Sequence, residues 1–154
     1  MDMEVNRVDL DVRRTNVRCT KDGRFKLRKK GNDERGIKYR VFALRIIRMV
    51  NAMPNTIAGM AIARQIIRSG TSPSANYRAA CIAKSDKDFL NKLKMVQEEI
   101  DETSHWLSLI IDSEMLPKAK VQDLYEESVE LRRITTKAII TTKNKVEASE
   151  RERL

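Results

Sequence analysis

The chain has few of the residues on which disulfide-rich, loop-rich and many catalytic proteins depend. Among its 154 residues are five glycines, three prolines, two cysteines and one histidine, and only 5% are aromatic. The two cysteines occur in different contexts, Cys19 in a basic stretch and Cys81 in a segment with helical periodicity, which favours a reduced pair over a disulfide. The abundant residues are Leu, Ile, Ala, Lys, Arg and Glu, a composition typical of an all-helical protein.

Long hydrophobic runs are also missing. The longest apolar run, residues 57–63, is much shorter than the roughly 20 residues that cross a bilayer. The N-terminus opens with acidic residues instead of the basic start of a signal peptide. We therefore expect a soluble, cytoplasmic protein with no membrane partner.

Acidic residues are absent from a third of the chain. Residues 35–85 contain nine Lys or Arg and no Asp or Glu, whereas residues 86–131 have a net charge of −7 in a protein of net charge +9. Two interpretations remain open. Either the basic part attracts polyanions, or acidic and basic helices lie against each other and neutralise their charges.

Helical periodicity predicts an all-α protein, an antiparallel up-down-up-down four-helix bundle over residues 37–143. The expected helices cover residues 37–53, residues 57–84, a segment from the N-cap Ser85 to a turn at 112–116, and a segment from Pro117 to about Thr142. We expect the second helix to be interrupted or kinked at residues 70–73, with Ser72 as the cap of its second half. Residues 1–36 read as a flexible basic N-terminal arm, and residues 144–154 as a charged C-terminal tail that frays.

Two apolar seams with heptad spacing mark the expected core. They are Phe89, Leu93, Val96, Ile100, Thr103, Leu107 and Ile110 on the third helix, and Val121, Leu124, Ser128, Leu131, Thr135 and Ala138 on the fourth. The first helix has two stripes, Val41, Leu44 and Ile47, and Phe42, Ile46, Met49 and Met53. This is more apolar surface than one bundle core requires, so we expect self-association through this helix.

The segment at residues 68–81 is rich in small and hydroxyl side chains and has two interpretations. In the structural one, which we favour, small residues let helices approach closely, and Ser72 and Asn76 satisfy the backbone groups that Pro73 frees. In the functional one, the same groups bind a phosphate together with Arg68 and Arg78.

Several motifs resemble, in order and spacing, a bacterial four-helix-bundle family of proteins encoded in intervening sequences of 23S rRNA genes. They are residues 42–47 (FALRII), 63–72 (ARQIIRSGTS), 75–80 (ANYRAA), 88–93 (DFLNKL) and 98–107 (EEIDETSHWL). The resemblance implies an up-down-up-down bundle that assembles into a barrel-like homopentamer. A more distant likeness is to the accessory variability protein of diversity-generating retroelements, a basic pentamer that binds nucleic acid and a reverse transcriptase. The resemblance implies no catalytic activity.

Catalysis and cofactors are not expected from the residues either. Glu102 and His105 have the Glu-x-x-His spacing of di-iron bundles, but such sites need a second copy of the motif and the chain has one histidine. No glycine-rich phosphate loop occurs. We therefore interpret His105 as structural or interfacial, and expect a non-enzyme without a metal or cofactor.

The best functional candidates are basic residues of the first two helices: Arg45, Arg48, Arg64, Arg68 and Arg78, assisted by Arg28, Lys29 and Lys30 of the arm. Arginine binds phosphate oxygens bidentately, so this set predicts binding of RNA or DNA by a homo-oligomer. Few aromatics are available for base stacking, so binding should follow the backbone with little sequence specificity. The alternative is a protein–protein scaffold, for example for a reverse transcriptase or other polymerase, that binds no nucleic acid itself.

Overall fold

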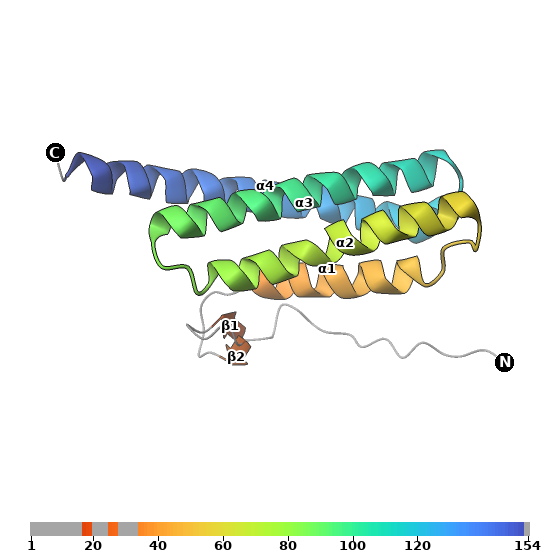
Figure 1. The fold of residues 1–154 in the computed structure, drawn as a ribbon, viewed down its shortest axis with the longest axis horizontal. Coiled ribbons are helices and arrows are strands. Elements are labelled where there is room, and N and C mark those ends of the chain that lie inside the picture. Colours follow the sequence, from red (N-terminus) through yellow and green to blue (C-terminus); the bar gives the residue numbers. More distant parts are fainter. Residues whose placement is uncertain (1–16, 20–24, 28–33, 153–154) are drawn as a thin grey trace.

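Four helices form the body of the computed structural model, which describes residues 17–19, 25–27 and 34–152. They are α1 (Glu34–Val50), α2 (Ile57–Ala80), α3 (Asp86–Asp112) and α4 (Lys118–Arg151). Each helix packs against the next, and α4 closes the ring by packing against α1. The α1–α2 and α3–α4 connections lie at one end and the α2–α3 connection at the other (Figure 1). The predicted antiparallel four-helix bundle is confirmed.

Two short strands precede the bundle. Strands β1 (Val17–Cys19) and β2 (Phe25–Leu27) pair antiparallel, with Arg18 opposite Lys26. β1 contacts α1, below the bundle in the view of Figure 1. Residues 34–36 of the predicted N-terminal arm belong to α1. The rest of the arm, including Arg28, Lys29 and Lys30, lies outside the described residues.

Side-chain caps set the starts of two helices. The Thr56 hydroxyl accepts a hydrogen bond from the Gly59 amide (3.0 Å) at the start of α2, and the Ser85 hydroxyl accepts one from the Asp88 amide (3.1 Å) at the start of α3. Each bond satisfies a backbone donor that the helix cannot. The predicted cap at Ser85 is confirmed. None of the described helices is long and apolar enough to cross a membrane.

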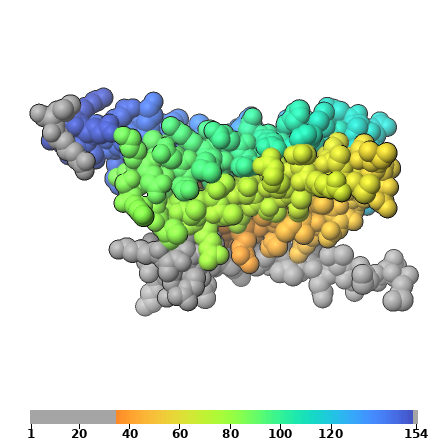
Figure 2. All heavy atoms as spheres, viewed as in Figure 1, coloured from red at the N-terminus to blue at the C-terminus, as the bar shows by residue number. Residues whose placement is uncertain are grey.

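Three helix ends and one helix start differ from the prediction. α1 begins at Glu34 instead of residue 37, and α2 ends at Ala80 instead of residue 84. α1 ends at Val50, because the next residues form a tight turn in which the Ala52 amide donates to the Met49 carbonyl (2.9 Å). α4 continues to Arg151 instead of ending near Thr142. The extra turns are held to the start of α3 by ion pairs, Lys145 with Asp86 (3.0 Å) and Glu150 with Lys87 (3.3 Å). Figure 2 shows this end of α4 projecting past the α2–α3 connection.

The predicted interruption of α2 is wrong, because α2 is one continuous helix with Pro73 inside it, while a kink at residues 70–73 stays a prediction. Ser72 therefore caps nothing. Proline removes one backbone donor, a local cost that buried packing can outweigh. Pro73 is itself buried, and so are Ser69 and Gly70 one turn earlier. The Thr71 hydroxyl donates to the Ile67 carbonyl (2.7 Å), which adds a bond within this part of the helix.

The predicted seams of α3 and α4 form the core. All of their members are buried except Phe89, which is partly buried. From α1 the core takes the stripe that contains Phe42, Ile46 and Met49. Tyr39, which the apolar periodicity missed, is fully buried, with its ring centroid 5.1 Å from that of Tyr77.

Hydroxyl pairs cross the core between neighbouring helices. Ser69 bonds to Thr103 (3.0 Å) between α2 and α3, and Ser104 to Ser128 (2.8 Å) between α3 and α4. The Tyr39 hydroxyl bonds to Thr135 (2.7 Å) between α1 and α4. Among the described side chains, no buried nitrogen or oxygen lacks a partner. Satisfied polar pairs of this kind favour one register over apolar alternatives.

A Ser128→Ala substitution should therefore lower the free energy of unfolding by about 1 kcal/mol. It removes the bond that the Ser104 hydroxyl donates to Ser128, after which that hydroxyl can donate to the Ile100 carbonyl (3.0 Å) instead. Urea denaturation measures the change. Ser108→Ala is the matched control, since that hydroxyl bonds only to a carbonyl of its own helix. Equal losses in the two variants would show that the interhelical bond contributes nothing.

Candidate nucleic-acid interface

The five arginine candidates of the bundle do not form one patch. Arg45 lies where α1 packs on α4, and its guanidinium forms an ion pair with Glu127. Arg68 lies where α2 packs on α3, at the opposite seam of the four-helix ring. The structure thus divides the predicted site between two sides of the bundle.

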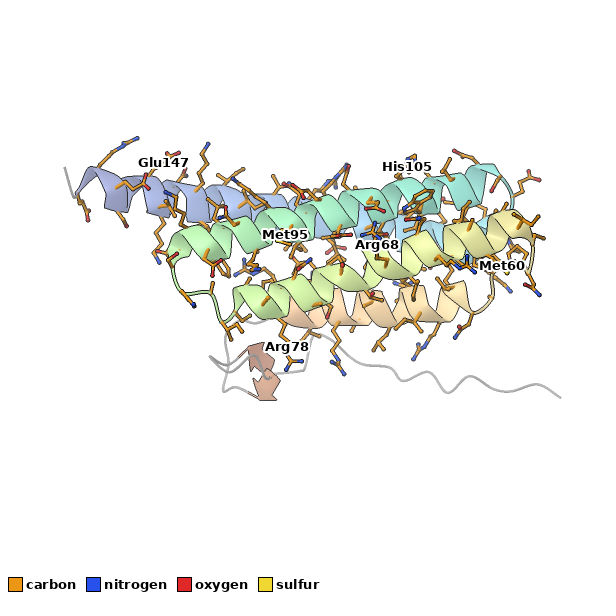
Figure 3. The ribbon with its side chains drawn as sticks, in the orientation of Figure 1. Met60, Arg68, Arg78, Met95, His105 and Glu147 are labelled. Atoms are coloured by element: carbon orange, nitrogen blue, oxygen red, sulfur yellow. The ribbon has the colours of Figure 1, made fainter. Side chains whose placement is uncertain are left out.

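Arg68 is held by two acids of α3. Its guanidinium lies 3.3 Å from a Glu99 carboxylate oxygen and also forms an ion pair with Glu102. The Glu102 carboxylate accepts a further hydrogen bond from Trp106 Nε1 (3.1 Å). Figure 3 shows Arg68 between the two helices. This arginine is committed to its neighbours within the chain.

Arg48, Arg64 and Arg78 are exposed, and none of them pairs with an acid of the described chain. Arg64 precedes Arg68 by one helical turn, so a paired and an unpaired arginine lie next to each other on α2. Arg78 points away from α3 in Figure 3. Within the described residues, no acid occupies the donors of these three side chains.

Ion pairs between helices neutralise part of the segregated charge. Lys38 of α1 pairs with Glu130 of α4 (3.1 Å), and Arg132 of α4 pairs with Asp101 of α3 (2.7 Å). The expected neutralisation of acidic and basic helices therefore takes place in part. It leaves several arginines of α1 and α2 without a partner in the described part of the chain.

The acids around these arginines have shifted pKa values. Hydrogen bonding from Arg68 lowers the pKa of Glu102, while burial raises the pKa of Glu99 despite the nearby arginine. Burial likewise raises the pKa of Glu127, and Arg45 opposes that shift. Glu102 is the acid for which the ion pair dominates over desolvation.

This difference predicts a pH dependence of stability. Because the folded state lowers the pKa of Glu102, its contribution is present above the ordinary carboxyl range and is lost as pH falls through the folded pKa. We expect Glu102→Gln to cost roughly 0.5–1 kcal/mol at pH 7 and less at pH 2 to 3, where the carboxylate becomes protonated. Glu99, with its raised pKa, contributes in the opposite sense, so Glu99→Gln should be the milder change at pH 7. Chemical denaturation at both pH values measures the free energy of unfolding of the two variants. A larger loss at pH 7 for Glu99→Gln than for Glu102→Gln would contradict the lowered pKa of Glu102 and the raised pKa of Glu99.

The segment at residues 69–76 is used for packing. Ser69 is buried against Thr103, and a side-chain carbon at Gly70 would lie 2.7 Å from Ile46 Cγ2. The glycine thus lets α1 and α2 approach closely. These contacts support the structural interpretation of the segment over phosphate binding.

His105 is exposed and lies edge-on to Trp106, with ring centroids 5.3 Å apart. Within the described ranges, no three His, Cys, Asp or Glu side chains are grouped so that they could hold a metal ion.

A pocket at the α1–α4 seam includes a basic residue that the sequence reasoning missed. Its volume is about 330 Å³, and it is lined by Arg45, Arg48, Met49, Ala52, Leu116, Lys120 and Leu124. Lys120 comes from the first turn of α4, and residue spacing within one helix gives no sign that it approaches Arg48. The pairing of α1 with α4 brings the two side chains to one pocket.

Sequence comparison decides the family. The sequence profile of the 23S rRNA-intervening sequence protein family matches residues 37–137, most of the bundle. The chain belongs to this family. The predicted family resemblance is confirmed, and the N-terminal strands lie outside the matched residues.

A crystal structure supports the same family. It is that of a protein of unknown function of the S23 ribosomal protein family from Bacteroides thetaiotaomicron. Its sequence is 33% identical, with a TM-score of 0.65 over 68% of the present chain and 97% of the other. Comparison with curated proteins finds no match. The family and the bundle are thus established, and the activity has to be argued from the surface.

Proposed function

We propose that this member of the 23S rRNA-intervening sequence protein family is a non-enzymatic, cytoplasmic homo-oligomer that binds RNA or DNA with little sequence specificity. The observation that carries the proposal is the set of exposed arginines, Arg48, Arg64 and Arg78, that have no acid partner among the described residues. An unpaired guanidinium keeps its planar set of donors for phosphate oxygens. The contacts would follow the backbone, because only 5% of the residues are aromatic.

Self-association would multiply these contacts. Leu44 and Ile47 of α1 remain 37% and 39% exposed, on the stripe that the core does not use. Covering this stripe with another subunit would remove apolar surface from water. In a homopentamer, which the family resemblance implies, each arginine recurs around the symmetry axis, and weak phosphate contacts add by multivalency.

A second candidate is a protein–protein scaffold, for example for a reverse transcriptase or other polymerase, without nucleic-acid binding of its own. The observation that favours it is the engagement of Arg45 and Arg68 in ion pairs within the chain. In that case the basic residues serve mainly to hold helices together.

Neutralising paired and unpaired arginines separately distinguishes the two. We expect Arg64→Gln with Arg78→Gln to lower affinity for structured RNA at least tenfold and to reduce the slope of log affinity against log salt. Arg68→Gln should lower affinity less, since its charge is already compensated by Glu99 and Glu102. Fluorescence anisotropy with a labelled RNA over a salt series measures both effects.

Light scattering on each variant checks that the oligomer is intact, and circular dichroism checks that the protein is folded. Unchanged RNA affinity in a folded Arg64→Gln, Arg78→Gln protein would reject these residues as the binding surface. An oligomer that falls apart in this variant, with no RNA affinity in the wild type, would support the scaffold.

A further inference from the structure

The pocket at the α1–α4 seam combines positive charge with an apolar floor. Arg45, Arg48 and Lys120 supply the charge, and none of the described residues that line the pocket is an acid. The floor consists of Met49, Leu116 and Leu124, each at most 7% exposed. Ala52 of the α1–α2 connection and Leu116 of the α3–α4 connection line the pocket. These two connections lie at the same end of the bundle (Figure 1).

The three cations differ in how they are held. Arg45 forms its ion pair with Glu127, which fixes the guanidinium at one side of the pocket. Arg48 and Lys120 are exposed, and within the described chain neither has an acid partner. Two available cations above buried apolar side chains match a ligand that is anionic at one end and apolar at the other.

We propose that this pocket takes one unstacked nucleotide of a single-stranded nucleic acid. The phosphate would contact Arg48 and Lys120, and the base would lie on the apolar floor. A volume of about 330 Å³ falls in the range of small-ligand sites, which starts at about 300 Å³. The inference rests on the proposed function and names its substrate class, because a base can enter the pocket only where it is free of a duplex stack.

An acidic peptide would pair with the cations of the pocket equally well, but its carboxylate side chains would not cover the apolar floor. Its carboxylates lie on short side chains, whereas a nucleotide has a flat base next to its phosphate. Arginine also matches the geometry of a phosphate with two donors at once. We therefore commit to the nucleotide, and treat binding of an acidic peptide as an outcome of the test.

Filling the pocket without changing its charge provides the test. Ala52 lines the pocket and is exposed, in the turn after α1, so Ala52→Leu adds apolar bulk inside it. The matched control is Ala61→Leu, an exposed alanine of α2 that does not line the pocket. The probes are labelled oligothymidine of about 15 nucleotides, within the footprint of typical single-strand sites, and a duplex of the same length.

We expect Ala52→Leu to weaken oligothymidine binding at least tenfold and to leave duplex binding and the Ala61→Leu protein unchanged. Unchanged oligothymidine affinity would overturn the pocket while leaving phosphate binding by the exposed arginines intact. A wild-type protein that binds neither probe at low salt would instead overturn the proposed function. If polyglutamate displaces the labelled probe as well as unlabelled oligothymidine does, the pocket recognises negative charge alone, which would contradict the proposal.

A second measurement does not depend on the variant's folding. Titration of uridine monophosphate into the ¹⁵N-labelled wild-type protein should shift the amide resonances of Arg48, Ala52 and Lys120. Inorganic phosphate should shift those of Arg48 and Lys120 only weakly. Equal shifts with both ligands, or shifts that miss these residues, would overturn the base contact.

Discussion

The Gly70→Val variant is expected to lose about 3 kcal/mol of unfolding free energy, the upper end of what overpacking costs. A side-chain carbon at this position would lie 2.7 Å from Ile46 Cγ2 and 2.9 Å from Ile46 Cγ1. Ile46 is fully buried and branched at Cβ, so it cannot rotate away without strain. The variant therefore forces α1 and α2 apart. Urea denaturation followed by circular dichroism measures the loss.

A double-mutant cycle assigns this loss to the contact with Ile46. Ile46→Ala removes the two Cγ atoms that lie nearest to the added carbon and leaves Cβ at 3.2 Å, so the two substitutions should couple by about 0.5–3 kcal/mol, within the usual range for residues in contact. Ala75→Val, at an exposed site of the same helix, controls for the helix propensity of valine, which costs several tenths of a kcal/mol. Additive effects of the Gly70 and Ile46 substitutions would contradict the close approach of α1 and α2.

The second large effect concerns assembly. Leu44→Asp together with Ile47→Asp should convert the proposed oligomer to monomers while the bundle stays folded. Both side chains lie on the outward stripe of α1, so two carboxylates there are tolerated in a monomer but are costly when a subunit covers them. Size-exclusion chromatography with light scattering gives the mass directly.

Ile57→Asp is the control for this variant. Ile57 is 88% exposed, more than either stripe residue, but it lies at the start of α2. It should leave the oligomer intact. A monomeric wild-type protein, or an unchanged mass in the double variant, would show that α1 is not the assembly surface.

Most of the fold follows from the residue pattern because burial in a bundle is periodic. The heptad seams of α3 and α4 predicted nearly all of the buried side chains of those helices. Tyr39 was missed because its hydroxyl needs a partner, and Thr135 supplies it from a helix far along the chain. The helix was expected to be interrupted at Pro73 because the backbone preference of proline takes no account of how α2 packs on its neighbours.

The candidate site was predicted less completely, because charge counts do not say which arginine meets which acid. Arg64 and Arg68 are one helical turn apart and cannot be distinguished from the sequence, yet only Arg68 pairs with Glu99 and Glu102. The approach of Lys120 to Arg48 depends on how α4 returns along α1. Sequence reasoning identified the basic helices, and the tertiary contacts divide their residues into paired and unpaired.

The binding of the wild-type protein to structured RNA, single-stranded DNA and duplex DNA across a salt series tests the central claim most directly. We predict binding whose logarithm falls linearly and steeply with the logarithm of salt concentration, as expected when several phosphates are contacted. Single strands should bind more tightly than the duplex. No binding to any of the three at low salt would contradict nucleic-acid binding, and would show that the basic residues serve ion pairs within the chain and contacts between proteins.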